Sequence, residues 1–212
     1  MTRLGRDRAP RPLPRPGPLP LPGRPRRGKP FRVLILGGAR SGKSVTAERL
    51  LAERDQVEYV ATGPLPDAED PDWADRVRLH RLRRPAHWTT LETLELERVL
   101  AGPGLTRERL RVPVLVDCLS TWLAGVMDEC GLWQAAPGAD KQLTERVDGL
   151  LDAWRSTRRH IVAVSNEVGS GVVPATASGL RYRDELGVLN TRIAAGCEQV
   201  WLCTAGIARR LR

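Results

Sequence analysis

The residue types between positions 37 and 44 can hold a phosphate chain. They fit the pattern G-x-x-x-x-G-K-[ST] and follow a short apolar run. Glycines let the backbone turn so that successive N–H groups point at phosphate oxygens, and a helix that begins here adds its positive N-terminus. The sequence therefore predicts a nucleotide-binding loop, called the phosphate loop below. Its residues are Gly37, Gly38, Ala39, Arg40, Ser41, Gly42, Lys43 and Ser44.

Two side chains of this loop have specific chemistry. In such loops the lysine, here Lys43, reaches the β- and γ-phosphates, and the hydroxyl of Ser44 binds Mg²⁺. The chain contains 31 arginines and only three lysines, yet a lysine stands at this position. Because lysine is a compact point charge and arginine a planar fork, this choice favours phosphate binding over a plain Gly-rich turn.

An acid at the end of a second apolar run fits the same site. The run 112–116 (VPVLV) ends at Asp117, which places a carboxylate at the carboxyl edge of a strand. A nucleotide-binding protein of this kind needs an acid there to hold water on Mg²⁺. We therefore predict that Ser44 and Asp117 form the metal site, although Pro113 leaves the register of this strand open.

A histidine lies on a basic stretch that ends at Pro85. At helical spacing Arg76, His80, Arg83 and Arg84 share one face. Guanidinium groups can grip phosphates, and nearby positive charge favours a neutral imidazole that can attack phosphorus. From these residues alone, His80 is either a nucleophile or a histidine on a solvated basic helix.

The elements that must position these residues alternate between strand and helix patterns. Continuous apolar runs, typical of buried parallel strands, occur at 32–36, 57–61, 112–116, 161–164 and 199–203. Apolar residues at helical spacing predict helices at 119–130 and 143–154. We therefore predict an α/β fold of the P-loop NTPase type, with a mostly parallel central sheet flanked by helices.

Charge and proline separate the start of the chain from the rest. Residues 1–30 contain nine of the 34 basic residues, one acid and nine of the 17 prolines. They predict a disordered Pro/Arg-rich tail, and residues 31–212 a single nucleotide-binding domain. Since the domain carries a net charge of only +1, it is not expected to bind nucleic acid.

The remaining composition favours a reduced, cytoplasmic protein. The apolar runs are far shorter than the roughly 20 residues that span a bilayer, and no apolar core of a secretory signal is present. The cysteines show no C-x-x-C spacing and predict neither disulfides nor a metal site; they are Cys118, Cys130, Cys197 and Cys203.

The motifs together resemble a known family, the bifunctional adenosylcobinamide kinase/adenosylcobinamide-phosphate guanylyltransferases of cobalamin biosynthesis. The resemblance covers essentially residues 31–212, and its narrowest motifs are the NEVG-x-G-[IV]-VP loop and the histidine followed by RPAHW. It rests on GGARSGKS (37–44), YVATG (59–63), RV-x-x-H (76–80), RRPAHW (83–88), LVDCLSTWL (115–123), SNEVGSGVVP (165–174), RYRDELGVLN (181–190) and VWLCTAGI (200–207).

The resemblance implies two reactions and a role for each matching position. In one, GTP or ATP phosphorylates adenosylcobinamide; in the other, His80 takes up GMP from GTP as a phosphoramidate and passes it to adenosylcobinamide phosphate, giving adenosylcobinamide-GDP. It also implies Mg²⁺ as cofactor, a corrinoid partner and a homotrimer. Nucleotide-contacting positions outside the phosphate loop are implied for Ala61, Thr62, Gly63, Arg81, Leu82, Arg83, Arg84, Glu92 and Asp117.

Some features stay outside this resemblance. The loop Pro64–Pro71 is a few residues longer than usual, and Asp72-Trp73 replaces a common acid–Met pair. Asn166 and Glu167 are open between corrinoid contact, nucleotide contact and loop bracing, whereas Arg181, Arg183 and Asp184 are expected simply to begin a helix.

Two other functions remain as alternatives. The protein is another small-molecule P-loop kinase without nucleotidyl transfer, or it is a nucleotide-gated binding module whose basic tail binds a partner.

Overall fold

The computed structural model describes residues 30–66, 70–102 and 104–212. The predicted tail falls almost entirely outside these residues, as do three positions of the loop Pro64–Pro71. Within the described residues, no helix is long and apolar enough to cross a membrane.

A seven-stranded sheet runs through the described part of the chain, in the order β3-β2-β4-β5-β1-β6-β7. Every neighbouring pair is parallel except β6 and β7, which are antiparallel. The mostly parallel sheet expected from the apolar runs is thus confirmed. The strands are β1 (Arg32–Gly37), β2 (Glu58–Ala61), β3 (Thr89–Glu92), β4 (Val114–Asp117), β5 (Ile161–Asn166), β6 (Gln199–Thr204) and β7 (Ile207–Arg210).

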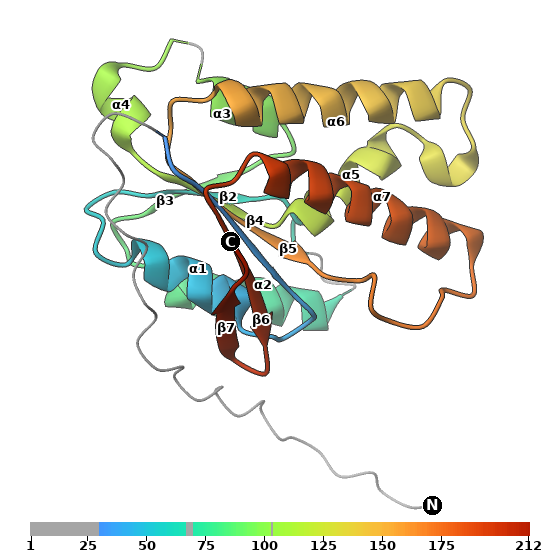
Figure 1. Ribbon diagram of the computed structural model, residues 1–212, viewed down its shortest axis with the longest axis horizontal. Helices are drawn as coiled ribbons and strands as arrows, with labels where there is room; N and C mark the ends of the chain where they lie inside the picture. The colour runs from blue at the N-terminus through green and yellow to red at the C-terminus, as the bar shows by residue number, and fades with distance from the viewer. Residues whose placement is uncertain (1–29, 67–69, 103) are drawn as a thin grey trace, which may run out of the picture.

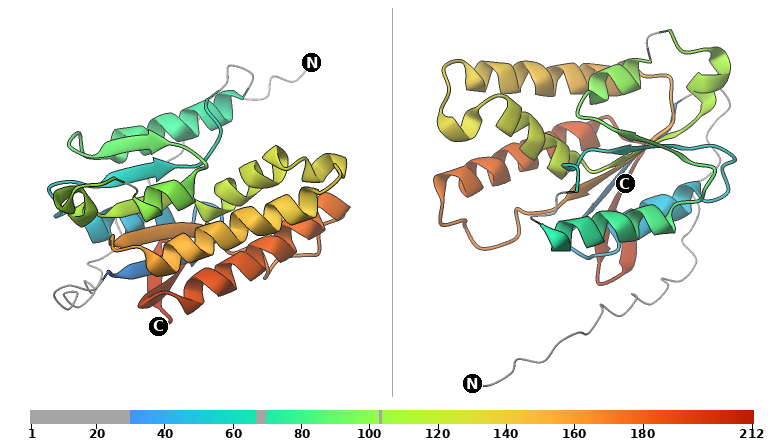
Figure 2. Two further views of the ribbon diagram at one scale, coloured as in Figure 1. Left: turned by 90° about the horizontal axis from the view of Figure 1, so that it is seen from above. Right: turned by 180° about the vertical axis from the view of Figure 1, so that it is seen from behind.

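Helices cover both faces of this sheet (Figure 1). One face carries α3, α5, α6 and α7, whose apolar residues form a large core with β4 and β5. The opposite face carries α1 and α2, as the view from behind also shows (Figure 2). The helices are α1 (Lys43–Leu51), α2 (Pro71–Arg83), α3 (Leu96–Ala101), α4 (Arg107–Arg111), α5 (Leu119–Glu129), α6 (Ala139–Ser156) and α7 (Ala177–Ala195), with a 3₁₀ turn η1 (Leu132–Gln134).

One predicted strand begins later than the sequence suggested. The run 112–116 was expected to be extended throughout, but β4 covers only Val114–Asp117. Pro113 has no N–H to give to a ladder, so the residue stays at the strand entrance, where its carbonyl accepts a bond from the N–H of Glu58 (3.0 Å). The correction fixes the register, and Asp117 lies opposite Ala61 of β2 and Val164 of β5.

Candidate functional site

The phosphate loop connects β1 to α1 in a backbone path that its glycines require. A Cβ on Gly37 would lie 2.4 Å from the Ser41 hydroxyl and 2.6 Å from the carbonyl oxygen of Cys203. Gly42 has a φ of 93°, a left-handed conformation that glycine adopts without strain, and it caps the N-terminus of α1. The turn between β6 and β7 braces the loop, because the N–H of Gly206 donates to the carbonyl of Ser41 (3.0 Å).

Lys43 lies inside this loop. Its Nζ donates to the carbonyl oxygen of Gly38 at 3.0 Å, and the residue is only 5% exposed. Burial lowers the pKa of Lys43 from its ordinary value of 10.5, although Cys118 and Asp117 nearby raise it in part. A phosphate group in the loop would give this buried ammonium a stronger partner than a carbonyl oxygen.

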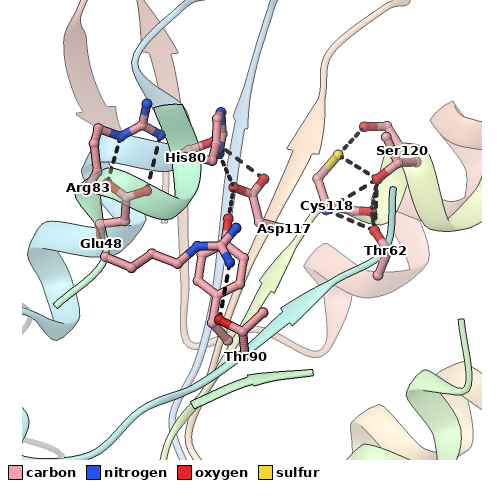
Figure 3. A network of polar contacts seen from close by, with 12 residues as sticks. Glu48, Thr62, His80, Arg83, Thr90, Asp117, Cys118 and Ser120 are labelled. Atoms are coloured by element: carbon pink, nitrogen blue, oxygen red, sulfur yellow. Dashed lines mark hydrogen bonds and ion pairs between the residues drawn. The ribbon is translucent and has the colours of Figure 1, made fainter. Parts of the chain in front are cut away.

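The carboxylate of Asp117, at the end of β4, contacts three side chains (Figure 3). Its Oδ1 accepts a hydrogen bond from the Ser44 hydroxyl (3.3 Å), and its Oδ2 accepts one from Tyr59 (2.5 Å). The Nδ1 of His80 lies 3.4 Å from the same Oδ2. Burial raises the pKa of Asp117, but the hydrogen bonds from His80, Tyr59 and Ser44 outweigh it and hold the pKa below 3.8.

His80 reaches this carboxylate because α2 is anchored near both ends. At the start, Asp70 caps the helix by accepting from the N–H of Trp73 (2.9 Å), whose indole N–H donates to the carbonyl of Pro64 (2.9 Å). Gly63 leaves room for the Trp73 ring, because a Cβ on Gly63 would lie only 2.6 Å from Cζ2 of Trp73. At the other end, Nε and Nη2 of Arg83 bond to both oxygens of Glu48 in α1, each at 3.2 Å.

Of the three arginines predicted beside His80, one does not lie on its helix. They were expected to share the His80 face, but α2 ends at Arg83, and Arg84 continues in extended conformation because Pro85 follows. The Arg84 guanidinium instead lies over the ring of Tyr59, 3.4 Å from its centroid. Arg76 lies 5.8 Å from the Trp73 ring. Arg76 and Arg83 lie on α2, four positions before and three positions after His80, so the prediction is wrong for Arg84 alone.

The other predicted nucleotide positions surround the same sheet edge. Arg81 pairs with Glu92 at the end of β3 (2.5 Å), and Leu82 is 70% exposed. Ala61 ends β2, and the buried Thr62 hydroxyl donates to the carbonyl of Cys118 (2.6 Å). Thr62 also accepts from the N–H of Cys118 (3.0 Å), so its side chain fastens β2 to the residue after β4.

Two residues of the site were not predicted. Tyr59 is 1% exposed, and burial together with Asp117 raises its pKa well above 10, which keeps the hydroxyl protonated. Glu48 holds the Arg83 guanidinium. The hydroxyl of a tyrosine inside a predicted buried strand was the available signal for Tyr59. A glutamate on a helix gave no comparable signal for Glu48.

The loop after β5 lies beside the phosphate loop. The N–H of Glu167 donates to the carbonyl of Gly37 (3.1 Å), and the carbonyl of Asn166 accepts from Asn190 of α7 (3.0 Å). Arg181, Arg183 and Asp184 lie on a helix as predicted but do not begin it, because α7 starts at Ala177. Arg181 forms ion pairs with Asp140 and Glu185. A further ion pair within α7 joins Arg183 to the neighbouring Asp184 (3.6 Å).

The donors at this edge suit one metal ion. Among the described residues, no three His, Cys, Asp or Glu side chains form a group that could hold a metal ion. The adjacent Ser44 hydroxyl and Asp117 carboxylate are hard oxygen donors, and Mg²⁺ is usually bound by one or two such groups together with phosphates and water. All four cysteines are buried and free.

The fold and the phosphate loop define the class of protein. A parallel sheet with a G-x-x-x-x-G-K-[ST] loop between β1 and α1 is the arrangement of P-loop NTPases. Among solved structures, an ATPase from the type III secretion system of pathogenic bacteria is similar in fold, with a TM-score of 0.51 at 12% identity. That match covers 85% of this chain and 56% of the ATPase.

The family follows from sequence. Residues 33–211 match the model of the cobinamide kinase / cobinamide phosphate guanyltransferase family, and the chain belongs to this family of enzymes. It is 43% identical over 184 residues to the bifunctional adenosylcobalamin biosynthesis protein CobP of Pseudomonas aeruginosa, covering 86% of this chain and 98% of that protein. It is 32% identical over 186 residues to the bifunctional adenosylcobalamin biosynthesis protein CobU of Salmonella typhimurium, with 85% and 99% covered.

Proposed function

We propose that the protein phosphorylates adenosylcobinamide with GTP or ATP and then transfers GMP from GTP, through a guanylyl-histidine, to adenosylcobinamide phosphate. The observation that carries the proposal is the contact of His80 with Asp117, which also binds Ser44 of the phosphate loop. A nucleophile and a triphosphate site thus meet at one carboxylate. Family membership supports these substrates, since the model of the cobinamide kinase / cobinamide phosphate guanyltransferase family matches residues 33–211.

In the phosphorylation step, the backbone N–H groups of residues 37–44 and the Lys43 ammonium hold the triphosphate. Their positive charge stabilises the negative charge that spreads over the transferred phosphoryl group. Ser44 and Asp117 would hold Mg²⁺, which neutralises phosphate charge when bound. The terminal hydroxyl of adenosylcobinamide attacks the γ-phosphorus, and the nucleoside diphosphate leaves.

In the transfer step, a neutral His80 attacks the α-phosphorus of GTP, and the bond to pyrophosphate breaks. The phosphate of adenosylcobinamide phosphate then attacks the same phosphorus, and the electron pair of the N–P bond returns to the ring. Splitting one displacement into two is the usual benefit of a covalent intermediate. The residues proposed to contact the nucleotide lie on α2, β2 and β3 or directly after β2 and α2. They are Ala61, Thr62, Gly63, Arg81, Leu82, Arg83, Arg84 and Glu92.

The test is labelling of the protein with GTP that carries ³²P at the α-phosphate, with γ-labelled GTP in parallel. We expect acid-labile label on protein from the α-position only, and none in His80→Asn, which should retain much of the phosphorylation of cobinamide. His87→Asn is the matched control, because His87 is an exposed histidine seven positions further on. Phosphorylation of another small molecule without any protein label would instead support an ordinary kinase.

A further inference from the structure

The two oxygens of Asp117 face different partners. Oδ1 accepts from the hydroxyl of Ser44 at the start of α1, whereas Oδ2 faces Tyr59 and the Nδ1 of His80. The carboxylate can therefore serve the phosphate loop with one oxygen and the histidine with the other. Figure 3 shows His80 and Asp117 pointing toward one another from α2 and β4.

Tyr59 prevents this carboxylate from turning. Its ring is packed in the core on the α1 face of the sheet, with the Arg84 guanidinium over it. The hydroxyl lies 2.5 Å from Oδ2 of Asp117. A side chain held between Ser44 and Tyr59 cannot rotate without losing one of two hydrogen bonds, so Oδ2 remains directed at His80.

The histidine is restrained in turn. Its helix is tied to α1 by the Arg83–Glu48 pair and to Pro64, in the segment after β2, by Trp73. Its side chain is 20% exposed, and Nδ1 is the ring nitrogen that faces the carboxylate. Because a carboxylate accepts and does not donate, the proton of the neutral ring belongs on Nδ1, which leaves the lone pair on Nε2.

We propose that Asp117 holds His80 through Nδ1, so that GMP is carried on Nε2, and that Tyr59 is the positioning residue that keeps this carboxylate in place. The inference rests on the proposed guanylyl-histidine and specifies which atom forms it. The Nε2 lone pair attacks the α-phosphorus, the P–O bond to pyrophosphate breaks, and pyrophosphate leaves with its electron pair. The ring becomes positively charged with its proton still on Nδ1, where the negative Asp117 stabilises it.

The site of attachment can be measured directly on the full chain. The protein is incubated with GTP and MgCl₂ and freed of excess nucleotide, and the nucleoside is removed with periodate and base. After alkaline hydrolysis, the two isomers of phosphohistidine are separated chromatographically. We expect the Nε2 isomer. The Nδ1 isomer as the main product overturns the inference while leaving the guanylyl-histidine intact; the absence of any histidine-bound phosphate removes both.

The positioning role has its own test in Tyr59→Phe, which removes only the hydroxyl. We expect kcat of guanylylation to fall about tenfold, the size of one lost hydrogen bond to a charged group, with KM for GTP changed less than about twofold. Tyr182→Phe is the matched control, because Tyr182 also donates one hydrogen bond, to the carbonyl of Ser120 (3.0 Å), and packs against the core on the other face of the sheet. Equal kinetics in the two variants, or a loss in KM alone, overturns the role of Tyr59.

Discussion

Arg83 and Glu48 form a two-point ion pair that joins the last turn of α2 to α1. Both contacts are 3.2 Å, and the Glu48 side chain is 11% exposed against 37% for Arg83. The described residues of α2 include none that is fully buried, so polar anchors such as this pair must hold it on the sheet. The helix that carries His80 is therefore attached by charge more than by a hydrophobic face.

The first prediction concerns this pair. Glu48→Gln keeps the size of the side chain but loses the charge, and we expect the free energy of unfolding to fall by about 1 kcal/mol, since Arg83 stays partly hydrated. For a chain of this size that lowers Tm by about 2–4 °C in a calorimetric scan. Glu92→Gln is the control, because its pair with Arg81 joins side chains 33% and 52% exposed. A larger fall in the control contradicts the expectation.

The second prediction uses two adjacent glycines. In Gly37→Ala the new methyl meets Ser41 and the backbone of Cys203, which cannot yield cheaply, whereas nothing lies within 4 Å of a Cβ at Gly38. We expect Gly37→Ala to lower the free energy of unfolding by about 2 kcal/mol and Gly38→Ala to change it by less than about 0.5 kcal/mol. Denaturant unfolding of the two variants side by side measures this. Equal effects would show that the loop relaxes around the methyl.

The third prediction concerns His160, whose Nδ1 accepts a hydrogen bond from the N–H of Phe31 (3.1 Å) and must be neutral to do so. Burial, followed by the charge of Arg54, lowers the pKa of His160 below 6.5. The unfolded chain then binds the proton more readily, so the stabilisation is complete above pH 6.5 and is lost as the pH falls toward the folded pKa.

The measurement is Tm as a function of pH for the wild type and for His160→Gln, whose amide oxygen can accept the same bond without titrating. We expect the wild type to lose stability more steeply than the variant below pH 6.5. Parallel curves would mean that His160 contributes nothing to the pH dependence.

The fourth prediction separates folding from catalysis at Lys43. Lys43→Met retains an apolar stem but removes a charge that burial disfavours, so Tm should not fall. Phosphorylation of cobinamide should fall by at least about a hundredfold, because the variant lacks the cation that stabilises the transferred phosphoryl group. Lys141→Met is the control, since Lys141 lies on α6 with its side chain 82% exposed. A variant that retains phosphorylation contradicts the role of Lys43.

The sequence predicted the parts of the fold that repeat a simple pattern. The runs that became β1, β2, β4, β5 and β6 were recognised because strands covered on both faces are continuously apolar. β3 was missed because it is an edge strand whose four residues, Thr89–Glu92, are all exposed. β7 was missed for a similar reason, because its arginines give no apolar signal.

The residues of the site likewise divide into those that the sequence predicted and those that it did not. The phosphate loop could be read because its residues are contiguous, and Asp117 because it ends an apolar run. Tyr59 and Glu48 could not, because their partners lie 58 and 35 residues away and only the folded sheet brings them together. The position of Arg84 was wrong because helical spacing was extended to this residue, which precedes Pro85 and for which the α conformation is disfavoured.

The hydrogen bond from Gly206 to Ser41 has a consequence for reading the effects of mutations. The nucleotide loop lies between the first strand and the first helix of the described residues, yet its framework includes the turn between the last two strands. The binding loop is therefore supported by a turn that lies far from it in the sequence. A variant that lacks this turn would carry every residue of the loop and still lose its support, so changes in the turn between β6 and β7 belong with mutations of the loop itself when a loss of nucleotide binding is interpreted.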